Sequence, residues 1–126
     1  MSYQVLFYLS LLNAVLLIDH EIDSAYWQEW NLFPPMQKGG INGFLTFHIP
    51  LLFIILYGLV LVHDSSIWGI LISMLVSAGG LFAFFFHFYH LRKGRPEFNT
   101  NFSKALLVST LLVSLAQMIE SVGLLL

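Results

Sequence analysis

The residues most able to do chemistry in this chain are imidazoles and carboxylates that lie near the ends of apolar segments. The histidines are His20, His48, His87 and His90, and the neighbouring carboxylates are Glu21, Asp23 and Glu29. Imidazole combined with carboxylate suits zinc, iron or manganese, whereas magnesium and calcium prefer sites made of oxygen alone. These residue types therefore predict a transition-metal site, and the alternative is a hydrogen-bonded polar cluster that fixes helix packing.

The spacing of these residues supports a shared site in two places. His20 and Asp23 are one helical turn apart, so the carboxylate could bind the same ion or orient the imidazole ring. His87 and His90 have the same spacing, which lets both rings reach one ion or two adjacent ions. Each pair also has a plain interpretation, because polar side chains near lipid headgroups often only cap or solvate a helix end.

His48 stands among bulky apolar neighbours, and a histidine in that setting needs a partner. The partner could be an ion or a hydrogen-bonding group on another helix. A catalytic metal centre also needs an acid or base close by, and Glu21 and Asp23 are the candidates for that role. The residues predicted to bind the ion are His20, Asp23, His48, His87 and His90.

Four apolar segments must position these side chains. They cover residues of about 3–27, 43–63, 66–91 and 102–126. Each is close to the roughly 20 residues that cross the hydrocarbon core of a bilayer as a helix. The segments and their short connections predict an all-α integral membrane protein: a four-transmembrane-helix antiparallel bundle that forms one domain over residues 1–126.

Composition supports a membrane protein and excludes several classes of function. With 58% hydrophobic and 10% charged residues, the chain has too little polar surface for a soluble globule. The absence of cysteine excludes disulfides and thiolate chemistry. A formal net charge of −2 argues against a nucleic-acid partner, since such proteins need an excess of basic residues.

Basic residues predict how the chain is oriented. All of them lie in or beside the first and third connections, at Lys38, Arg92, Lys93, Arg95 and Lys104. The positive-inside rule then places these connections in the cytoplasm and both termini outside, in what we expect to be a bacterial inner membrane. Because Met1 to Gln4 lack the basic start of a cleavable signal peptide, we expect the first helix to be retained. Membrane lipids are the predicted partners, with a homo-oligomer or a larger membrane complex as further candidates.

Small residues predict which helix is central in the bundle. Ser73, Ser77, Gly80 and Ala83 recur on one face of the third apolar segment. Small side chains let transmembrane helices approach closely, so we expect this face to pack inside the bundle and not against lipid.

Glu120 is an acidic residue near the opposite end of the fourth segment. Its nearest expected partners are His63 and Asp64 in the second connection. We predict a structural pair there and no relay to the other histidines, because roughly 20 Å of mostly apolar helix separates the two regions.

Three short motifs resemble those of a known group of proteins. Asp19–Asp23, Glu29–Trp30 and Phe47–Leu51 are similar to a His-Glu-x-Asp segment, a Glu-Trp pair and a His-x-Pro-Leu segment in small bacterial tetraspan membrane proteins of unknown function. The chain is also loosely similar to the HXXEE tetraspan families, although Asp23 and Ser24 stand where those families have paired glutamates. The resemblance brings no known activity, and it implies that the functional positions are His20, Glu21, Asp23 and His48.

The leading interpretation is a small membrane protein with a cytoplasmic metal centre, acting as an enzyme on a lipid or another membrane-soluble substrate. Hydrolase and oxidoreductase chemistry both stay open. One alternative is a non-catalytic membrane subunit or sensor whose polar cluster is structural. Another is a haem protein with two of the histidines as axial ligands, in which the phenylalanine-rich segment Phe82–Phe88 lines the haem.

Overall fold

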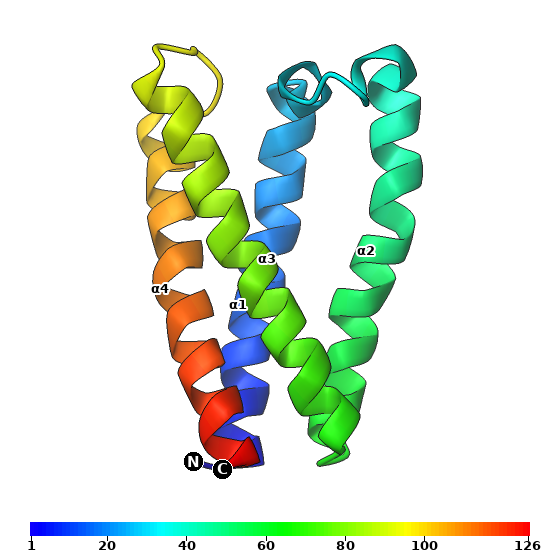
Figure 1. Ribbon diagram of the computed structural model, residues 1–126, viewed down its shortest axis with the longest axis vertical. Helices are drawn as coiled ribbons and strands as arrows, with labels where there is room; N and C mark the ends of the chain where they lie inside the picture. The colour runs from blue at the N-terminus through cyan, green and yellow to red at the C-terminus, as the bar shows by residue number, and fades with distance from the viewer.

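A computed structural model describes all residues, 1–126, and consists of helices without strands. The long helices are α1 (Tyr3–Tyr26), α2 (Gly40–His63), α3 (Ile67–Arg92) and α4 (Asn101–Leu125). Two short 3₁₀ helices, η1 (Glu29–Leu32) and η2 (Gln37–Gly39), join α1 to α2. All four long helices are long and apolar enough to cross a membrane, so the predicted four-helix membrane fold is confirmed (Figure 1).

Side-chain caps fix where helices begin. The Ser2 hydroxyl accepts a hydrogen bond from the Val5 N–H at 3.1 Å, and the Thr100 hydroxyl accepts one from the Ser103 N–H at 3.0 Å. Such caps satisfy backbone donors that have no partner within the first turn. Polar residues therefore set the starts of α1 and α4, whereas α2 begins after Gly39 without a side-chain cap.

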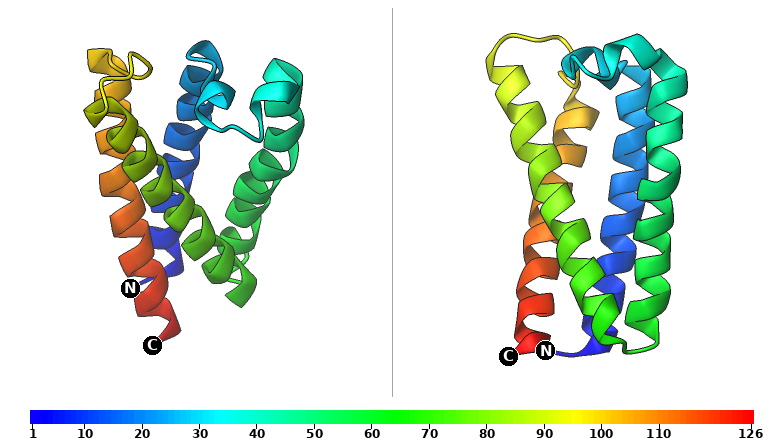
Figure 2. Two further views of the ribbon diagram at one scale, coloured as in Figure 1. Left: turned by 45° about the horizontal axis from the view of Figure 1, so that its top comes forward. Right: turned by 45° about the vertical axis from the view of Figure 1, so that its right-hand side comes forward.

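The helices alternate in direction, so the connections fall at two ends. Both termini and the α2–α3 turn lie at one end, and the η1–η2 connection and the α3–α4 loop lie at the other (Figures 1 and 2). We call this second end the loop end. All the lysines and arginines lie in its connections or in the adjoining turns, and all are exposed. The placement of the loop end in the cytoplasm stays a prediction from the positive-inside rule.

Helix α3 crosses the bundle obliquely. It lies beside α2 at the α2–α3 turn and beside α4 at the loop end, so α2 and α3 diverge toward the loop end (Figures 1 and 2). Gly69 permits the close approach at the turn, because an added Cβ there would lie 2.6 Å from the backbone carbon of Leu61. The divergence leaves space between the two helices near the predicted site.

Polar side chains from α1, α3 and α4 form a buried network in the centre of the bundle. The Gln117 Nε2 atom donates to the Ser73 hydroxyl at 2.7 Å, and Asn13 Nδ2 donates to Gln117 Oε1 at 2.6 Å. Ser114 and Ser10 complete it through bonds to Asn13 and Gln117. We call these five residues the central network. In a membrane such hydrogen bonds join helices that the hydrophobic effect alone would not hold together.

The small residues predicted to face the bundle do so at three of four positions. Ser73, Ser77 and Gly80 are buried, and an added Cβ at Gly80 would lie 2.1 Å from the Ser114 hydroxyl. Ala83 is half-buried and borders the space between α2 and α3 instead. The divergence of those helices explains why the packed face ends before Ala83.

The predicted pairing of Glu120 with His63 and Asp64 is wrong. Glu120 Oε1 accepts a hydrogen bond from the Ser2 backbone N–H at 2.6 Å, while exposed His63 contacts Asp64 at 3.2 Å. Helix α4 packs against α1 at this end, which brings the two termini together (Figure 1). The region between Glu120 and the histidines was also expected to be mostly apolar, and it holds the central network instead.

Candidate metal centre

His20 and His87 lie together inside the loop end. His20 comes from the C-terminal part of α1 and His87 from that of α3. Their ring centroids are 4.8 Å apart, and the two residues are 2% and 1% exposed. The helical spacing that buries Asn13 on α1 also turns His20 inward, because position 20 is seven residues further along the same face.

Glu29 reaches the two histidines because the chain reverses after α1. Gln28 has a left-handed backbone with φ of 54°, and η1 then carries Glu29 back over the bundle. The Glu29 Oε1 atom is 3.3 Å from His87 Nε2. One ligand atom from each of His20, Glu29 and His87 lies within 4.8 Å of the others. We call these three residues the triad.

The Glu29 carboxyl is held in its ionised form. Burial raises its pKa, but the adjacent His87 imidazole, 3.3 Å away, together with Ser24 and His20, lowers it by more. The pKa of Glu29 therefore lies below its ordinary value. At neutral pH the triad accordingly combines one carboxylate with two imidazoles.

Buried polar atoms without hydrogen-bond partners gather around the triad. They include both ring nitrogens of His87, His20 Nδ1, the Ser24 hydroxyl and Trp27 Nε1. Leaving one buried polar group unpaired costs on the order of 1–3 kcal/mol, so several in one place need a common explanation. An imidazole lone pair and a carboxylate oxygen that lie this close repel each other unless a proton or a metal ion lies between them, and a neutral imidazole nitrogen is a common metal ligand.

Phe98 covers the triad, and sequence reasoning missed it. Its ring centroid is 3.9 Å from that of His87 and 5.7 Å from that of His20, and the residue is 1% exposed. Phe98 has a φ of 63°, an uncommon conformation for a residue other than glycine. An apolar ring in the polar α3–α4 loop was the only signal for this role. Its position shields the triad from the aqueous side of the loop end.

His48 forms a separate pair with Glu21. Its Nδ1 atom lies 2.6 Å from the Phe44 carbonyl oxygen, which can only accept, so Nδ1 carries a proton. The other nitrogen, Nε2, lies 2.6 Å from Glu21 Oε2. A contact this short between two acceptors requires a second proton between them, on either the imidazole or the carboxyl. The Glu21–His48 pair therefore holds a proton.

The remaining predicted site residues lie near the triad without joining it. His90 is half-buried, and its Nδ1 donates to the Phe86 carbonyl of its own helix at 2.9 Å. Asp23 is half-buried, one turn beyond His20, with Oδ2 buried and unpartnered. The structure thus brings His20 and His87 together, and it leaves His48 with Glu21 because α2 diverges from α3. The sequence predicted Glu29 only as an additional oxygen donor, although the Glu-Trp pair at Glu29 and Trp30 had marked this position in the resemblance.

A cavity of about 530 Å³ opens beside both groups of polar residues. It lies between α1, α2 and α3, and 15 of its 20 lining residues are hydrophobic. Four of its polar lining residues are His20, Glu21, Glu29 and His48. Pockets of this size commonly hold small molecules, with a few polar groups in an apolar wall.

Aromatic residues of the α1–α2 connection close the cavity at the loop end. Trp30 packs on Phe44 of α2 with centroids 5.6 Å apart, and Phe33 stacks on Phe86 of α3 at 4.4 Å. This connection therefore bridges the gap between the diverging helices, and we call Trp30 and Phe33 the aromatic roof.

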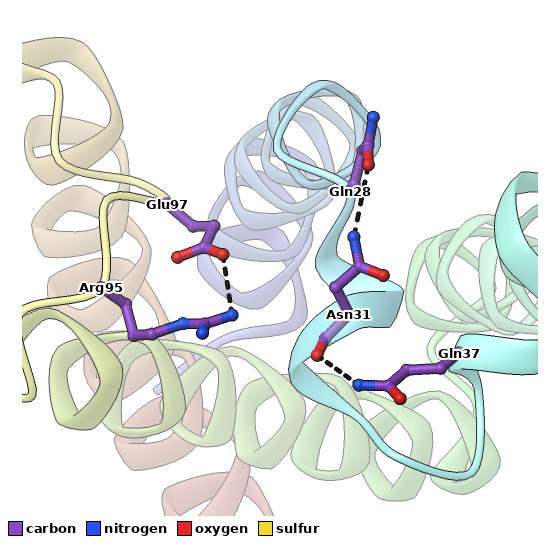
Figure 3. Close-up of polar contacts among 5 residues, drawn as sticks. All are labelled: Gln28, Asn31, Gln37, Arg95 and Glu97. Carbon is purple, nitrogen blue, oxygen red and sulfur yellow. Dashed lines mark hydrogen bonds and ion pairs between the residues drawn. The ribbon is translucent and has the colours of Figure 1, made fainter.

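Polar contacts hold both connections of the loop end in place (Figure 3). Asn31 Nδ2 donates to Gln28 Oε1 at 3.3 Å, and Gln37 Nε2 donates to the Asn31 carbonyl at 2.9 Å. These bonds fix the turns on either side of the aromatic roof. In the α3–α4 loop, the Arg95 guanidinium donates to the Glu97 carboxylate at 2.9 Å, and Glu97 directly precedes Phe98, which covers the triad.

A model of a family of unknown function (DUF6713) matches residues 6–124. The chain belongs to this family. The match spans the triad, the Glu21–His48 pair and the central network, and it agrees with the predicted likeness to small uncharacterised proteins. Similarity to the tetraspan group and to the HXXEE families stays a prediction. No match was found among curated proteins or among solved structures.

Proposed function

We propose that this integral membrane protein is a metal-dependent enzyme for a lipid or another membrane-soluble substrate, and that His20, Glu29 and His87 bind the ion. The observation that carries the proposal is His87: it is 1% exposed, both its ring nitrogens are unpartnered, and Glu29 Oε1 lies 3.3 Å away. Ligand atoms at about 2.0–2.2 Å from a tetrahedral ion are roughly 3.4 Å apart, which fits this distance.

Two imidazoles and one carboxylate are a donor set for zinc or iron(II), and manganese accepts the same ligands. Three protein ligands leave a position for water or substrate, as catalytic sites need. A bound ion would supply Lewis acidity and an activated water. Haem does not fit between His20 and His87, because axial ligands lie on opposite sides of the iron and their rings would be farther apart than 4.8 Å.

Other residues of this chain would support the chemistry. The Glu21–His48 pair lines the same cavity as the triad and can give or take the proton that it holds. Asp23, one turn from His20 on α1, has a buried oxygen available to orient the imidazole. Phe98 covers the triad on the aqueous side of the loop end and would keep water from it, which strengthens electrostatic interactions there.

Metal analysis of the purified protein tests the proposal. We expect near-stoichiometric zinc, iron or manganese in the wild type, and loss of the ion in His20→Ala, Glu29→Gln and His87→Ala. His90→Ala is the matched control, because His90 is on the same helix as His87 but bonds its own backbone, and it should keep the ion. A metal-free wild type, or equal loss in His90→Ala, would overturn the proposal.

A further inference from the structure

The cavity beside the triad extends from polar residues into the apolar interior. On α2 its lining runs from Phe44 to Ile55, and the part beyond His48 extends about 10 Å along the helix axis into the apolar interior. Leu75 and Val76 line the same depth on α3. A ligand that fills this space therefore needs one polar end and a hydrocarbon body that points toward the centre of the membrane.

The mouth of the cavity faces lipid and not water. Ile54, Leu75 and Phe82 line it and are 37%, 61% and 59% exposed. All three lie within the membrane-spanning parts of α2 and α3, where an exposed apolar side chain contacts acyl chains. Since the aromatic roof closes the loop end, a ligand enters sideways between the diverging helices.

We propose that this cavity takes from the bilayer a single-chain molecule with an uncharged hydroxyl or carbonyl head, such as a long-chain alcohol, and seats the head against Glu21 and His48. The pair shares one proton, so it offers both a donor and an acceptor while staying uncharged overall. This inference names the substrate class of the proposed metal centre and rests on that function.

Charge in the lining favours an uncharged head. No lysine or arginine lines the cavity, and the carboxylates of Glu21 and Glu29 do. A fatty acid carboxylate or a phosphate seated against Glu21 and His48 would therefore have no lysine or arginine as partner and would lie beside a glutamate, which is costly in an apolar wall. A fatty amine would have to break the existing Glu21–His48 contact to find a free carboxylate.

Photolabelling of the purified protein in nanodiscs tests this inference. The probe is a long-chain alcohol with a diazirine in its hydrocarbon chain, and labelled residues are mapped by mass spectrometry. We expect labelling on α2 and α3 at the depth of Ile54 and Leu75, and competition by unlabelled long-chain alcohol. Better competition by the matching fatty acid or fatty amine would overturn the assignment of an uncharged head.

Two glycines provide a matched pair of variants. Gly79 lines the cavity, and a Cβ added there meets no atom within 4 Å, so a larger side chain can begin there without a clash and we expect Gly79→Phe to occupy part of the cavity. Gly43 on α2 has equally open surroundings and does not line the cavity. We expect Gly79→Phe to lose the labelling and Gly43→Phe to keep it. Labelling of Gly79→Phe at the wild-type level would overturn the inference.

Metal content separates this inference from the proposed function. Gly79→Phe should keep its ion while it loses the labelling, because no residue of the triad lies within 4 Å of a Cβ added at Gly79. His87→Ala should lose its ion and keep the labelling, since the Glu21–His48 pair stays intact. A wild type that labels as expected but holds no ion contradicts the metal centre alone.

Discussion

The central network and the triad are both buried polar clusters inside a membrane bundle, yet their hydrogen bonding differs. In the central network, Gln117 and Asn13 bond three helices together through their side chains. In the triad, His87 has two buried nitrogens without hydrogen-bond partners. The network is packed tightly enough that a Cβ at Gly80 would clash, whereas the triad borders a cavity of about 530 Å³.

This difference distinguishes polar residues that join helices from polar residues that bind a ligand such as a metal ion. A satisfied network gains its stability from internal partners, and its loss should lower the free energy of unfolding. An unsatisfied cluster lowers stability until a ligand supplies the partners. The following changes should therefore act in opposite directions in the two regions.

Gly80→Leu should have the largest effect on stability. The new side chain would collide with Ser114 and Thr110, so we expect the free energy of unfolding to fall by about 2–3 kcal/mol through overpacking. Gly79→Leu is the matched control, because its Cβ meets no atom within 4 Å. Unfolding by SDS in mixed micelles measures both. Equal stability of the two variants would show that the network face is not closely packed.

Asn13→Leu should have a smaller effect in the same direction. It leaves Gln117 Oε1 without its donor and removes the bond to Ser114, so the free energy of unfolding should fall by about 1 kcal/mol, the scale seen for such bonds in membrane proteins. The same micelle titration measures it. An unchanged stability would mean that water or another side chain replaces Asn13, and that the network does not hold the helices together.

His87→Phe should change stability least, and in the opposite direction. In metal-free protein the substitution removes two buried nitrogens that make no hydrogen bond, and Glu29 can take up a proton once the imidazole that lowers its pKa is gone. The free energy of unfolding should therefore stay level or rise by up to about 1 kcal/mol. Added zinc should raise the thermal unfolding temperature of the wild type and not that of the variant. A loss of stability in metal-free His87→Phe would place the triad with the structural networks.

Much of the fold follows from the sequence. Apolar length predicts four helices whose ends lie close to the observed ones, and the basic residues share one end as expected. Small residues predict the packed face of α3 at Ser73, Ser77 and Gly80. These features depend on local sequence, which sets the length of a helix and the residues on each face.

The details of the site depend on tertiary geometry that local sequence does not fix. His48 stays apart from His87 because α3 crosses the bundle, and the angle of that crossing follows from packing at Gly69 and Gly80 together. Glu29 reaches the triad through a left-handed turn at Gln28, and Phe98 covers it through another. Glutamine and phenylalanine seldom adopt the left-handed backbone found at Gln28 and Phe98, so the sequence contains no turn signal at either position.

X-ray absorption spectroscopy of the metal-loaded protein tests the central claim most directly. The account predicts an ion bound by two imidazole nitrogens and one carboxylate oxygen at about 2.0–2.2 Å in the wild type, and no ion bound at this site in His87→Phe. The same spectrum in His48→Ala should match the wild type, since His48 belongs to the Glu21 pair. An ion surrounded by oxygen alone, or a spectrum that changes in His48→Ala and not in His87→Phe, would contradict the account.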